Sequence, residues 1–204
     1  MLQYGWRLLL GLTLLGVLFA CASQTWQESF DDVGDWLISS DAAADVTVAD
    51  GQLVVHIRQP GQLAWARTDR SFKNFHLTVD ATQVSGPLDN EYGVLFRMDG
   101  DNSFYVFSIS GDGYVRVAHY DRGTWLLLGS DWTPSTAIQQ GAATNRLEIV
   151  AEGSTLTFWV NGVQVTSVTG ADALRRGDIG LYAGAFNEPG VVIAFDNLIV
   201  EPLP

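Results

Sequence analysis

The sequence predicts an all-β protein in which two antiparallel sheets pack face to face as a sandwich. Apolar and polar residues alternate with a period of two over most of the chain from Gln52 onward, which is the pattern of half-buried strands. Turn signals containing glycine recur about every ten residues. No helical periodicity is sustained after the first twenty residues. Roughly a dozen short strands in one domain of this length favour two packed sheets.

The N-terminal segment is typical of a secretory signal peptide. Arg7 is the only charged side chain among the first 20 residues, and the stretch 8–20 that follows it is apolar and uncharged. Such a stretch is shorter than the roughly 20 apolar residues that cross a bilayer, but it suits the apolar region of a signal. We therefore expect residues 1–20 to be removed during export.

The end of this segment resembles the lipobox of bacterial lipoproteins. The residues are Leu18-Phe19-Ala20-Cys21, and Cys21 is the only cysteine of the chain. An unpaired thiol in an exported protein calls for an explanation, and lipidation provides one. We expect Cys21 to carry the lipid and residues 21–25 to be a short tether to a membrane of the cell envelope. The alternative is an ordinary signal peptide cut near Ala20 or Ala22.

Residues 26–204 are expected to form one β-sandwich domain. The clearest strand is 75–82, where Phe75, Leu77, Val79 and Ala81 alternate with polar residues. Further strands are predicted at residues 52–58, 63–68, 92–98, 104–109, 114–120, 125–128, 146–151, 155–160, 163–168, 178–184 and 191–200. Asn161-Gly162 is a type I′ hairpin signal between two of them. Residues 171–176 are expected to form a single helical turn.

Composition excludes one class of partner. The chain has 23 Asp and Glu against 11 Lys and Arg, for a formal net charge of −12. Binding to nucleic acid relies on clustered Lys and Arg that neutralise phosphates, and no such cluster occurs here. We expect no nucleic-acid partner.

Five stretches match a known family pattern. They are Asp89–Arg97, Phe104–Phe107, Leu156–Gly162, Gly177–Tyr182 and Phe195–Leu198. Together they resemble the concanavalin A-like lectin/glucanase superfamily, in its branch near the LamG and 3-keto-disaccharide hydrolase domains. The resemblance implies a jelly-roll sandwich in which one concave sheet often meets sugars. It does not fix an activity, because lectins, glycosidases and adhesion modules share this fold.

The motifs of catalysis are missing from the sequence. The glucanases of the superfamily carry Glu-x-Asp-x-x-Glu or a one-residue-shorter form on one strand, and neither string occurs here. Glu148 and Glu152 should point to the same face of a strand but lie about 13 Å apart along it. This distance exceeds the separation of the two carboxyl groups in a glycosidase. We therefore expect a carbohydrate-binding module without catalysis. A glycoside hydrolase of the 3-keto-disaccharide type and an envelope adhesion or structural protein remain the alternatives.

Sugar recognition needs aromatic faces and polar side chains on an outward surface. Trp159 alternates with the apolar residues Phe158 and Val160 along a predicted strand and is expected to point out of the core. Arg97 is likewise expected to point outward and to share a face with Glu91. The candidate carbohydrate-binding residues, for a polysaccharide or glycan partner, are Arg97, Trp159, Trp65, Glu91 and Tyr105.

Calcium is the metal that the sequence suggests most strongly, ahead of a site built from the scattered histidines His56, His76 and His119. Asp99-Gly100-Asp101-Asn102 places three oxygen-bearing side chains within four residues, and calcium prefers oxygen ligands. Asp196, near the last strand, is a second candidate, since similar jelly rolls sometimes hold a structural calcium at that place. The same residues are also common in plain turns. We expect no other cofactor.

Overall fold

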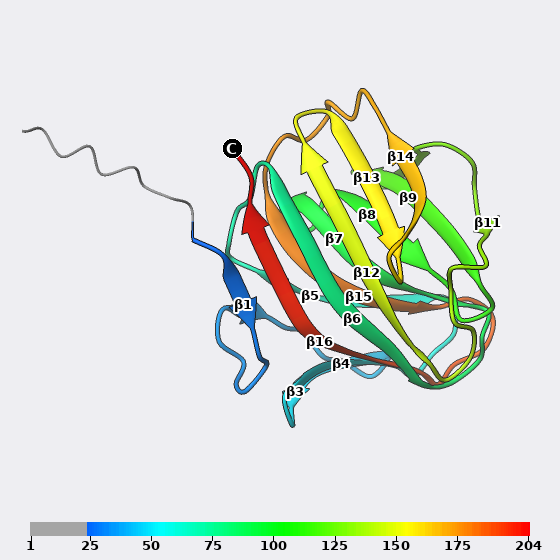
Figure 1. The fold of residues 1–204 in the computed structure, drawn as a ribbon. Coiled ribbons are helices and arrows are strands. Elements are labelled where there is room, and N and C mark those ends of the chain that lie inside the picture. Colours follow the sequence, from blue (N-terminus) through cyan, green and yellow to red (C-terminus); the bar gives the residue numbers. More distant parts are fainter. Residues whose placement is uncertain (1–23) are drawn as a thin grey trace, which may run out of the picture.

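The computed structural model describes residues 24–204, which form two antiparallel β-sheets and contain no helix (Figure 1). In sheet A the strands follow the order β14 (Val163–Val168), β13 (Thr155–Val160), β12 (Thr144–Glu152), β6 (Phe75–Ser85), β16 (Val191–Pro202), β4 (Gln52–Ile57) and β3 (Ala44–Ala49), and β1 (Trp26–Glu28) also pairs with β16. In sheet B the order is β10 (Thr124–Leu127), β9 (Tyr114–Asp121), β8 (Ser103–Ile109), β7 (Asn90–Asp99), β15 (Asp178–Ala185), β5 (Gln62–Thr68) and β2 (Trp36–Leu37), and β11 (Thr133–Pro134) also pairs with β9.

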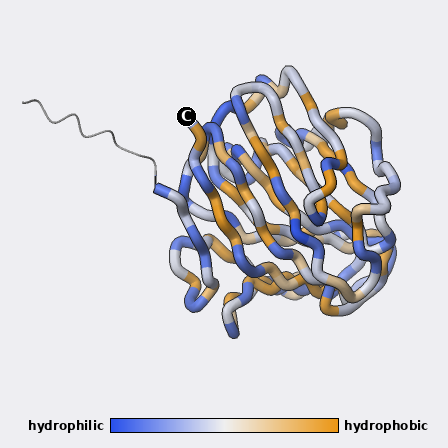
Figure 2. Tube along the Cα trace, viewed as in Figure 1, coloured by the Kyte–Doolittle hydropathy of each residue, from blue (hydrophilic) through white to orange (hydrophobic). Residues whose placement is uncertain are grey.

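The core lies between the two sheets. Alternate residues of each strand point inward, as in β6, where Phe75, Leu77, Val79 and Ala81 are fully buried. Figure 2 shows the resulting alternation of hydrophobic and hydrophilic residues along the strands of sheet A. Because successive side chains of a strand point to opposite faces, each sheet also presents an outer face directed away from this core. The two outer faces are the surfaces on which a ligand site can form.

The predicted all-β, two-sheet architecture is confirmed. Every strand predicted from residue 52 onward is present, and Asn161 and Gly162 both have the positive φ of a type I′ turn. Short strands β1, β2, β3 and β11 were not predicted. The expected helical turn at 171–176 is wrong, because that segment is an irregular loop.

The expected signal peptide, the lipidation of Cys21 and most of the tether lie outside the described residues. Within residues 24–204, no helix is long and apolar enough to cross a membrane.

A β-bulge in β7 reverses the orientation expected for Arg97. Phe96 pairs with Ile179, but the next pair in that ladder joins Met98 to Asp178, so Arg97 is an extra residue. Arg97 has φ 50°, and its side chain is completely buried. Its guanidinium donates to the carbonyl oxygens of Lys73 (3.0 and 3.2 Å) and Leu174 (3.1 Å). The expectation of an outward Arg97 is therefore wrong, because a bulge shifts the alternation by one residue.

Candidate functional site

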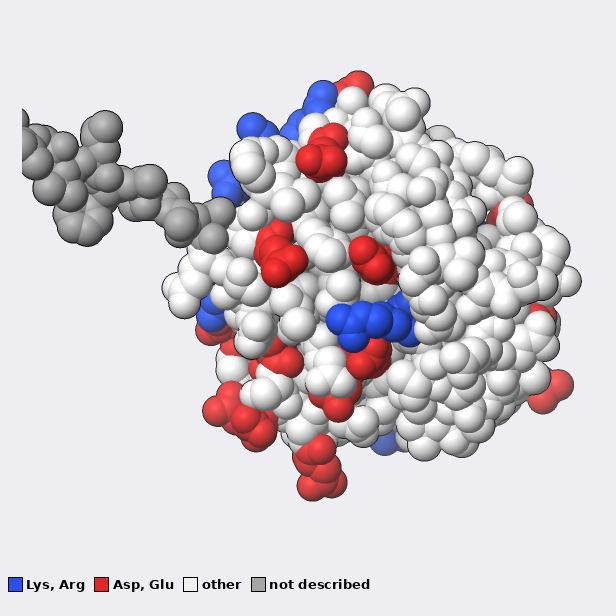
Figure 3. Space-filling view, viewed as in Figure 1, with Lys and Arg blue, Asp and Glu red and all other residues white. Residues whose placement is uncertain are grey.

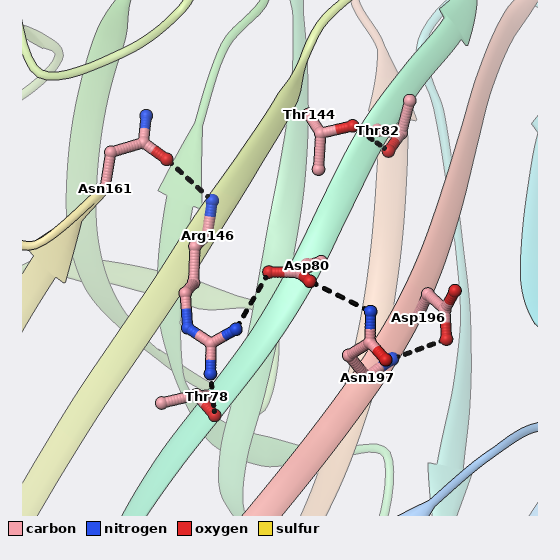
Figure 4. A network of polar contacts seen from close by, with 8 residues as sticks. All are labelled: Thr78, Asp80, Thr82, Thr144, Arg146, Asn161, Asp196 and Asn197. Carbon is pink, nitrogen blue, oxygen red and sulfur yellow. Dashed lines mark hydrogen bonds and ion pairs between the residues drawn. The ribbon is translucent and has the colours of Figure 1, made fainter.

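The outer face of sheet A is a polar surface whose side chains bind one another. Arg146 on β12 lies 3.4 Å from the Asp80 carboxylate of β6 and donates to the Thr78 hydroxyl at 3.1 Å (Figure 4). Asn197 donates to the other Asp80 oxygen at 3.0 Å. Acidic and basic groups accordingly lie side by side on the face shown in Figure 3. The Arg146, Asp80 and Asn197 side chains therefore bind one another.

The outer face of sheet B is different, because large apolar side chains cover it. Leu95, Met98, Phe104, Val106 and Tyr182 form a second buried cluster, separate from the core between the sheets. Each of them is at most 4% exposed, although it points away from the main core. Trp65 and Tyr120 pack against this cluster and are only partly buried themselves. A surface of this kind presents aromatic faces and edges to solvent.

The aromatic side chains of this face form a continuous row. Centroid distances are 6.3 Å for Trp65 and Phe104, 5.0 Å for Phe104 and Tyr120, and 5.0 Å for Tyr120 and Trp125. The Arg116 guanidinium then lies 5.2 Å from the Trp125 ring and 4.8 Å from the Trp132 ring. We call Trp65, Phe104, Tyr120, Trp125 and Trp132 the aromatic row.

The strand register explains how one face collects these groups. Trp65, Tyr182, Gly93, Ser108 and Arg116 are successive cross-strand partners on β5, β15, β7, β8 and β9. Partners directly opposite each other in a ladder point to the same face. Gly93 has no side chain, so Tyr182 can reach across β7 to form a hydrogen bond with the Ser108 hydroxyl.

A buried polar centre lies beneath the aromatic row. The Glu91 carboxylate accepts hydrogen bonds on one oxygen from Arg116 Nη2 at 2.7 Å and from the Tyr182 hydroxyl at 3.1 Å. The side chains of Glu91 and Arg116 are only 7% and 15% exposed, so this ion pair is largely shielded from water. We call Glu91, Ser108, Arg116 and Tyr182 the polar centre.

Burial dominates the electrostatics of this centre. Desolvation raises the pKa of the Glu91 carboxyl above its usual value of 4.5, although the Arg116 charge and the Tyr182 hydrogen bond oppose the shift. Burial, together with the Glu91 carboxylate, raises the pKa of Tyr182 well above its usual value of 10.0. Tyr182 therefore stays protonated at neutral pH and donates its hydrogen bond to Glu91.

The Trp65 end of the row borders a cavity of about 360 Å³. Trp65 Nε1 donates to the Asp101 carboxylate at 3.2 Å, and Arg67 lies 3.2 Å from Asp101 and 2.9 Å from Asp178. Leu37 and Leu63, both substantially exposed, contribute to the cavity wall. This end therefore combines an apolar wall with donors and acceptors whose positions are fixed by ion pairs.

The candidate residues predicted from the sequence do not form one site. Trp65 and Glu91 lie on the outer face of sheet B, whereas Trp159 lies on the outer face of sheet A. Tyr105 is 1% exposed and packs in the core between the sheets, where its hydroxyl accepts a hydrogen bond from the Leu174 amide at 3.3 Å. Tyr105, like Arg97, therefore cannot contact a ligand at the surface of the folded protein, and the assignment of both residues is corrected.

Four residues that matter most in this geometry were not predicted. They are Arg116, Trp125, Trp132 and Tyr182. Arg116 alternates with the buried residues Val115 and Val117 along its strand, and this alternation was the available signal that its side chain points away from the core.

The residues suggested for calcium are not gathered in one place. Asp99 and Asp101 lie at the turn between β7 and β8, where Asp101 binds Trp65 and Arg67. Asp196 lies on the outer face of sheet A, where it accepts a hydrogen bond from the Asn197 amide (Figure 4). Within residues 24–204 no group of three or more His, Cys, Asp or Glu side chains could hold a metal ion. Calcium binding stays a prediction.

Comparison with known proteins supports the fold. The sequence pattern of the 3-keto-alpha-glucoside-1,2-lyase-like domain matches residues 25–201. A search of curated protein sequences found no match.

Several solved structures share the sandwich at low sequence identity. The carbohydrate-binding module CBM66 from Bacillus subtilis is 18% identical, with a TM-score of 0.62 over 80% of this chain and 93% of the module. A β-1,3-1,4-glucanase (lichenase) derived from a mouse hindgut metagenome is 13% identical, with a TM-score of 0.65 over 89% of this chain and 100% of the glucanase. The Crh5 transglycosylase in complex with NAG is 15% identical, with a TM-score of 0.63 over 90% of this chain and 86% of the transglycosylase. These similarities confirm the jelly-roll architecture expected from the sequence.

Proposed function

The chain belongs to the family of 3-keto-alpha-glucoside-1,2-lyase-like domains, and on this premise we propose that it binds a polysaccharide through the outer face of sheet B without cleaving it. The observation that carries the proposal is the aromatic row, whose Trp65 end borders a cavity with the polar side chains of Arg67 and Asp101. Pyranose rings bind proteins by stacking their apolar faces on aromatic side chains while polar groups bind their hydroxyls. The resemblance of the fold to a carbohydrate-binding module supports the same reading.

The state of the carboxylates supports binding without hydrolysis. Glycosidases use a carboxylic acid and a carboxylate on opposite sides of the scissile bond. On the outer face of sheet B, Glu91 is paired with Arg116, and Asp101 and Asp178 are both paired with Arg67. Burial raises the pKa of Glu91 and of Asp178, but each of these carboxyl groups is held by an arginine instead of facing a second carboxyl group across a gap, as a glycosidase acid pair would.

The extent of the aromatic row favours a chain of sugars over a single sugar. The row runs from Trp65 on β5 to Trp125 on β10, the edge strand of sheet B. The Phe104 ring lies between the two tryptophans, with its centroid 6.3 Å from each of theirs, so the row is longer than a single ring-to-ring contact. We propose that several sugar units of one glycan contact this face at once.

Matched tryptophan variants test which face binds. The purified protein is first screened against a panel of polysaccharides, and affinities are then measured by calorimetry. Trp125→Ala and Trp65→Ala should each weaken binding by about 1 to 3 kcal/mol, the effect of removing a central aromatic anchor. Trp159→Ala is the matched control, because Trp159 is a partly buried tryptophan on the opposite face. Loss of binding in Trp159→Ala alone would move the site to the outer face of sheet A, around Trp159.

A second candidate function is a lyase acting on 3-keto glucosides, as the family description suggests. The structural observation that favours it is Glu91, a buried carboxyl with a raised pKa next to a protonated tyrosine. A carboxylate of raised pKa is suited to removing the proton beside a ketone. Release of product from a 3-keto-α-glucoside by the wild-type protein, abolished in Glu91→Gln, would favour the lyase over simple binding.

We also propose that the domain acts outside the cytoplasm, held at a membrane of the cell envelope by lipidated Cys21. The proposal rests on the apolar stretch 8–20 and the lipobox-like residues around Cys21. Two or more acyl chains on one residue hold a protein stably at a membrane, whereas one chain binds reversibly.

A further inference from the structure

A separate cavity of about 220 Å³ lies beside the Trp132 end of the aromatic row. It is lined by Asp89, Ser110, Asp112, Tyr114, Trp132 and Phe186. The Trp132 and Phe186 rings meet edge to face, with centroids 6.0 Å apart and planes at 82°. Its volume is about seven times the roughly 30 Å³ that one water molecule occupies in the liquid, so it has room for a group of several heavy atoms.

The two carboxylates of the cavity are not neutralised within the described part of the chain. Neither Asp89 nor Asp112 has a Lys, Arg or His nitrogen within 4.0 Å among residues 24–204. Asp89 accepts one hydrogen bond, from Asn187 at 3.3 Å, and Asp112 accepts one from the Ser110 hydroxyl. Each carboxylate therefore keeps one oxygen that no other described residue binds. None of the described residues that line the cavity is basic.

The walls of the cavity add a second preference for positive charge. The faces of aromatic rings attract cations, and ammonium groups are bound in proteins by cages of aromatic and acidic side chains. Trp132 already contacts one cation, since the Arg116 guanidinium lies 4.8 Å from its ring centroid. Tyr114 and Phe186 add two further aromatic walls, and Tyr114 is exposed enough (37%) to meet a ligand from solvent.

We propose that this cavity binds a positively charged amino group. Two carboxylates without a cationic partner among the described residues and three aromatic rings surround a small space. This arrangement matches an ammonium ion, whose N–H groups need acceptors and whose charge is attracted to aromatic faces. Because Trp132 belongs both to the cavity and to the aromatic row, the amino group is carried by a sugar unit of the bound glycan. This assignment of the substrate class, a glycan with free amino groups, rests on the proposed function.

The test compares oligosaccharides of glucosamine with N-acetylglucosamine oligosaccharides of the same length, together with tetramethylammonium as a free cation. Affinities of the purified protein are measured by calorimetry at mildly acidic pH, so that the glucosamine amino groups carry their positive charge. Asp89→Asn and Asp112→Asn keep the size of each side chain and its acceptor oxygen while removing the charge. Asp50→Asn is the matched control, because Asp50 is an exposed residue of the turn between β3 and β4 and is not part of the cavity.

The glucosamine oligosaccharide should bind more tightly than its N-acetylated counterpart, and each cavity variant should weaken its binding about tenfold, as expected for loss of one charge-assisted contact. The control variant should bind like the wild type. Equal affinities for the two oligosaccharides, unchanged by Asp89→Asn and Asp112→Asn, would overturn the inference and leave the proposed glycan binding intact. Binding of tetramethylammonium alone, lost in both cavity variants, would support the cation site while refuting the glycan as its source. Failure of every probe, with a neutral polysaccharide still bound through the aromatic row, would also overturn it.

Discussion

Replacing Arg116 by methionine should destabilise the protein by an amount that depends on pH. The change leaves the Glu91 carboxylate buried without its cation, 2.7 Å from where Arg116 Nη2 had been. A buried carboxylate that loses its partner can escape the cost by taking up a proton. The cost of the lost ion pair is therefore limited by the free energy needed to protonate Glu91 at the pH of the experiment.

That limit can be worked out from the usual glutamate pKa of 4.5. Protonating such a group costs about 3 kcal/mol at pH 7 and less than about 1 kcal/mol at pH 5, since one pH unit corresponds to about 1.4 kcal/mol. Loss of the two contacts between Arg116 and the tryptophan rings adds about 1 to 2 kcal/mol at either pH. The pKa of Glu91 is already raised, so its contribution to the free energy of unfolding is lost as pH rises from 4.5 through the pKa of the folded state, and Arg116→Met should enlarge this loss.

Urea unfolding followed by circular dichroism at pH 5 and pH 7 measures the effect. The set comprises the wild type, Arg116→Met, Glu91→Gln and the double variant. The extra loss of stability at pH 7 should appear in Arg116→Met and disappear when Glu91→Gln is added, because no carboxylate is then left without a partner. Equal losses at the two pH values, or strictly additive effects in the double variant, would refute the view that Arg116 compensates the Glu91 charge.

Three further predictions concern other parts of the chain. Arg97→Met should lower the free energy of unfolding by about 3 to 5 kcal/mol, because buried carbonyl groups lose a charged donor. Urea titration measures this loss, and the glycan affinity of the folded variant should equal that of the wild type. Cys21→Ser should move the protein from the membrane fraction to the soluble exported fraction, and unchanged partitioning into detergent would exclude the lipid anchor. Gly93→Ala should lower the free energy of unfolding more than Gly61→Ala does. A Cβ on Gly93 would lie 2.1 Å from the Phe107 carbonyl oxygen, whereas a Cβ on Gly61 would meet nothing within 4 Å. Crowding of a packed interior costs about 1 to 3 kcal/mol. Equal melting temperatures for the two glycine variants would contradict the close approach at Gly93.

The sequence predicted the strands well because their alternation follows directly from burial. In β6 every second residue from Phe75 to Ala81 is fully buried, and the residues between them are partly exposed. Such a pattern identifies both the strand and its inner face. The short strands β1 and β2 contain three and two residues, so no period can be recognised within them.

The orientation of residues in β7 and β8 could not be predicted in the same way. Nine of the ten residues of β7 and all seven of β8 are buried, so apolar residues occupy both faces. Alternation then gives no means of choosing the inner face, and Tyr105 was assigned to the wrong one. The bulge at Arg97 adds a second error, because alternation predicts which way a side chain points only where no extra residue interrupts the strand pairing.

Glycine provides the signal that was available for the outer face of sheet B. Gly93, Gly180 and Gly184 lie inside strands, where glycine usually marks a close approach of other groups. A Cβ on Gly184 would lie 2.3 Å from Leu63 Cδ2 and 3.0 Å from Glu91 Cγ, and one on Gly180 would lie 3.0 Å from the sulfur of Met98.

These glycines allow large neighbours on adjacent strands to lie flat against the sheet. Tyr182 crosses the space above Gly93 to reach Ser108, and Glu91 occupies the space beside its ladder partner Gly184. With those side chains lying low, Arg116 and the tryptophans beside it can cover them from above. A face built in two layers in this way buries its polar centre while presenting aromatic rings to solvent. This arrangement suits the recognition of a sugar by stacking, and the same layering shields Glu91 and raises its pKa.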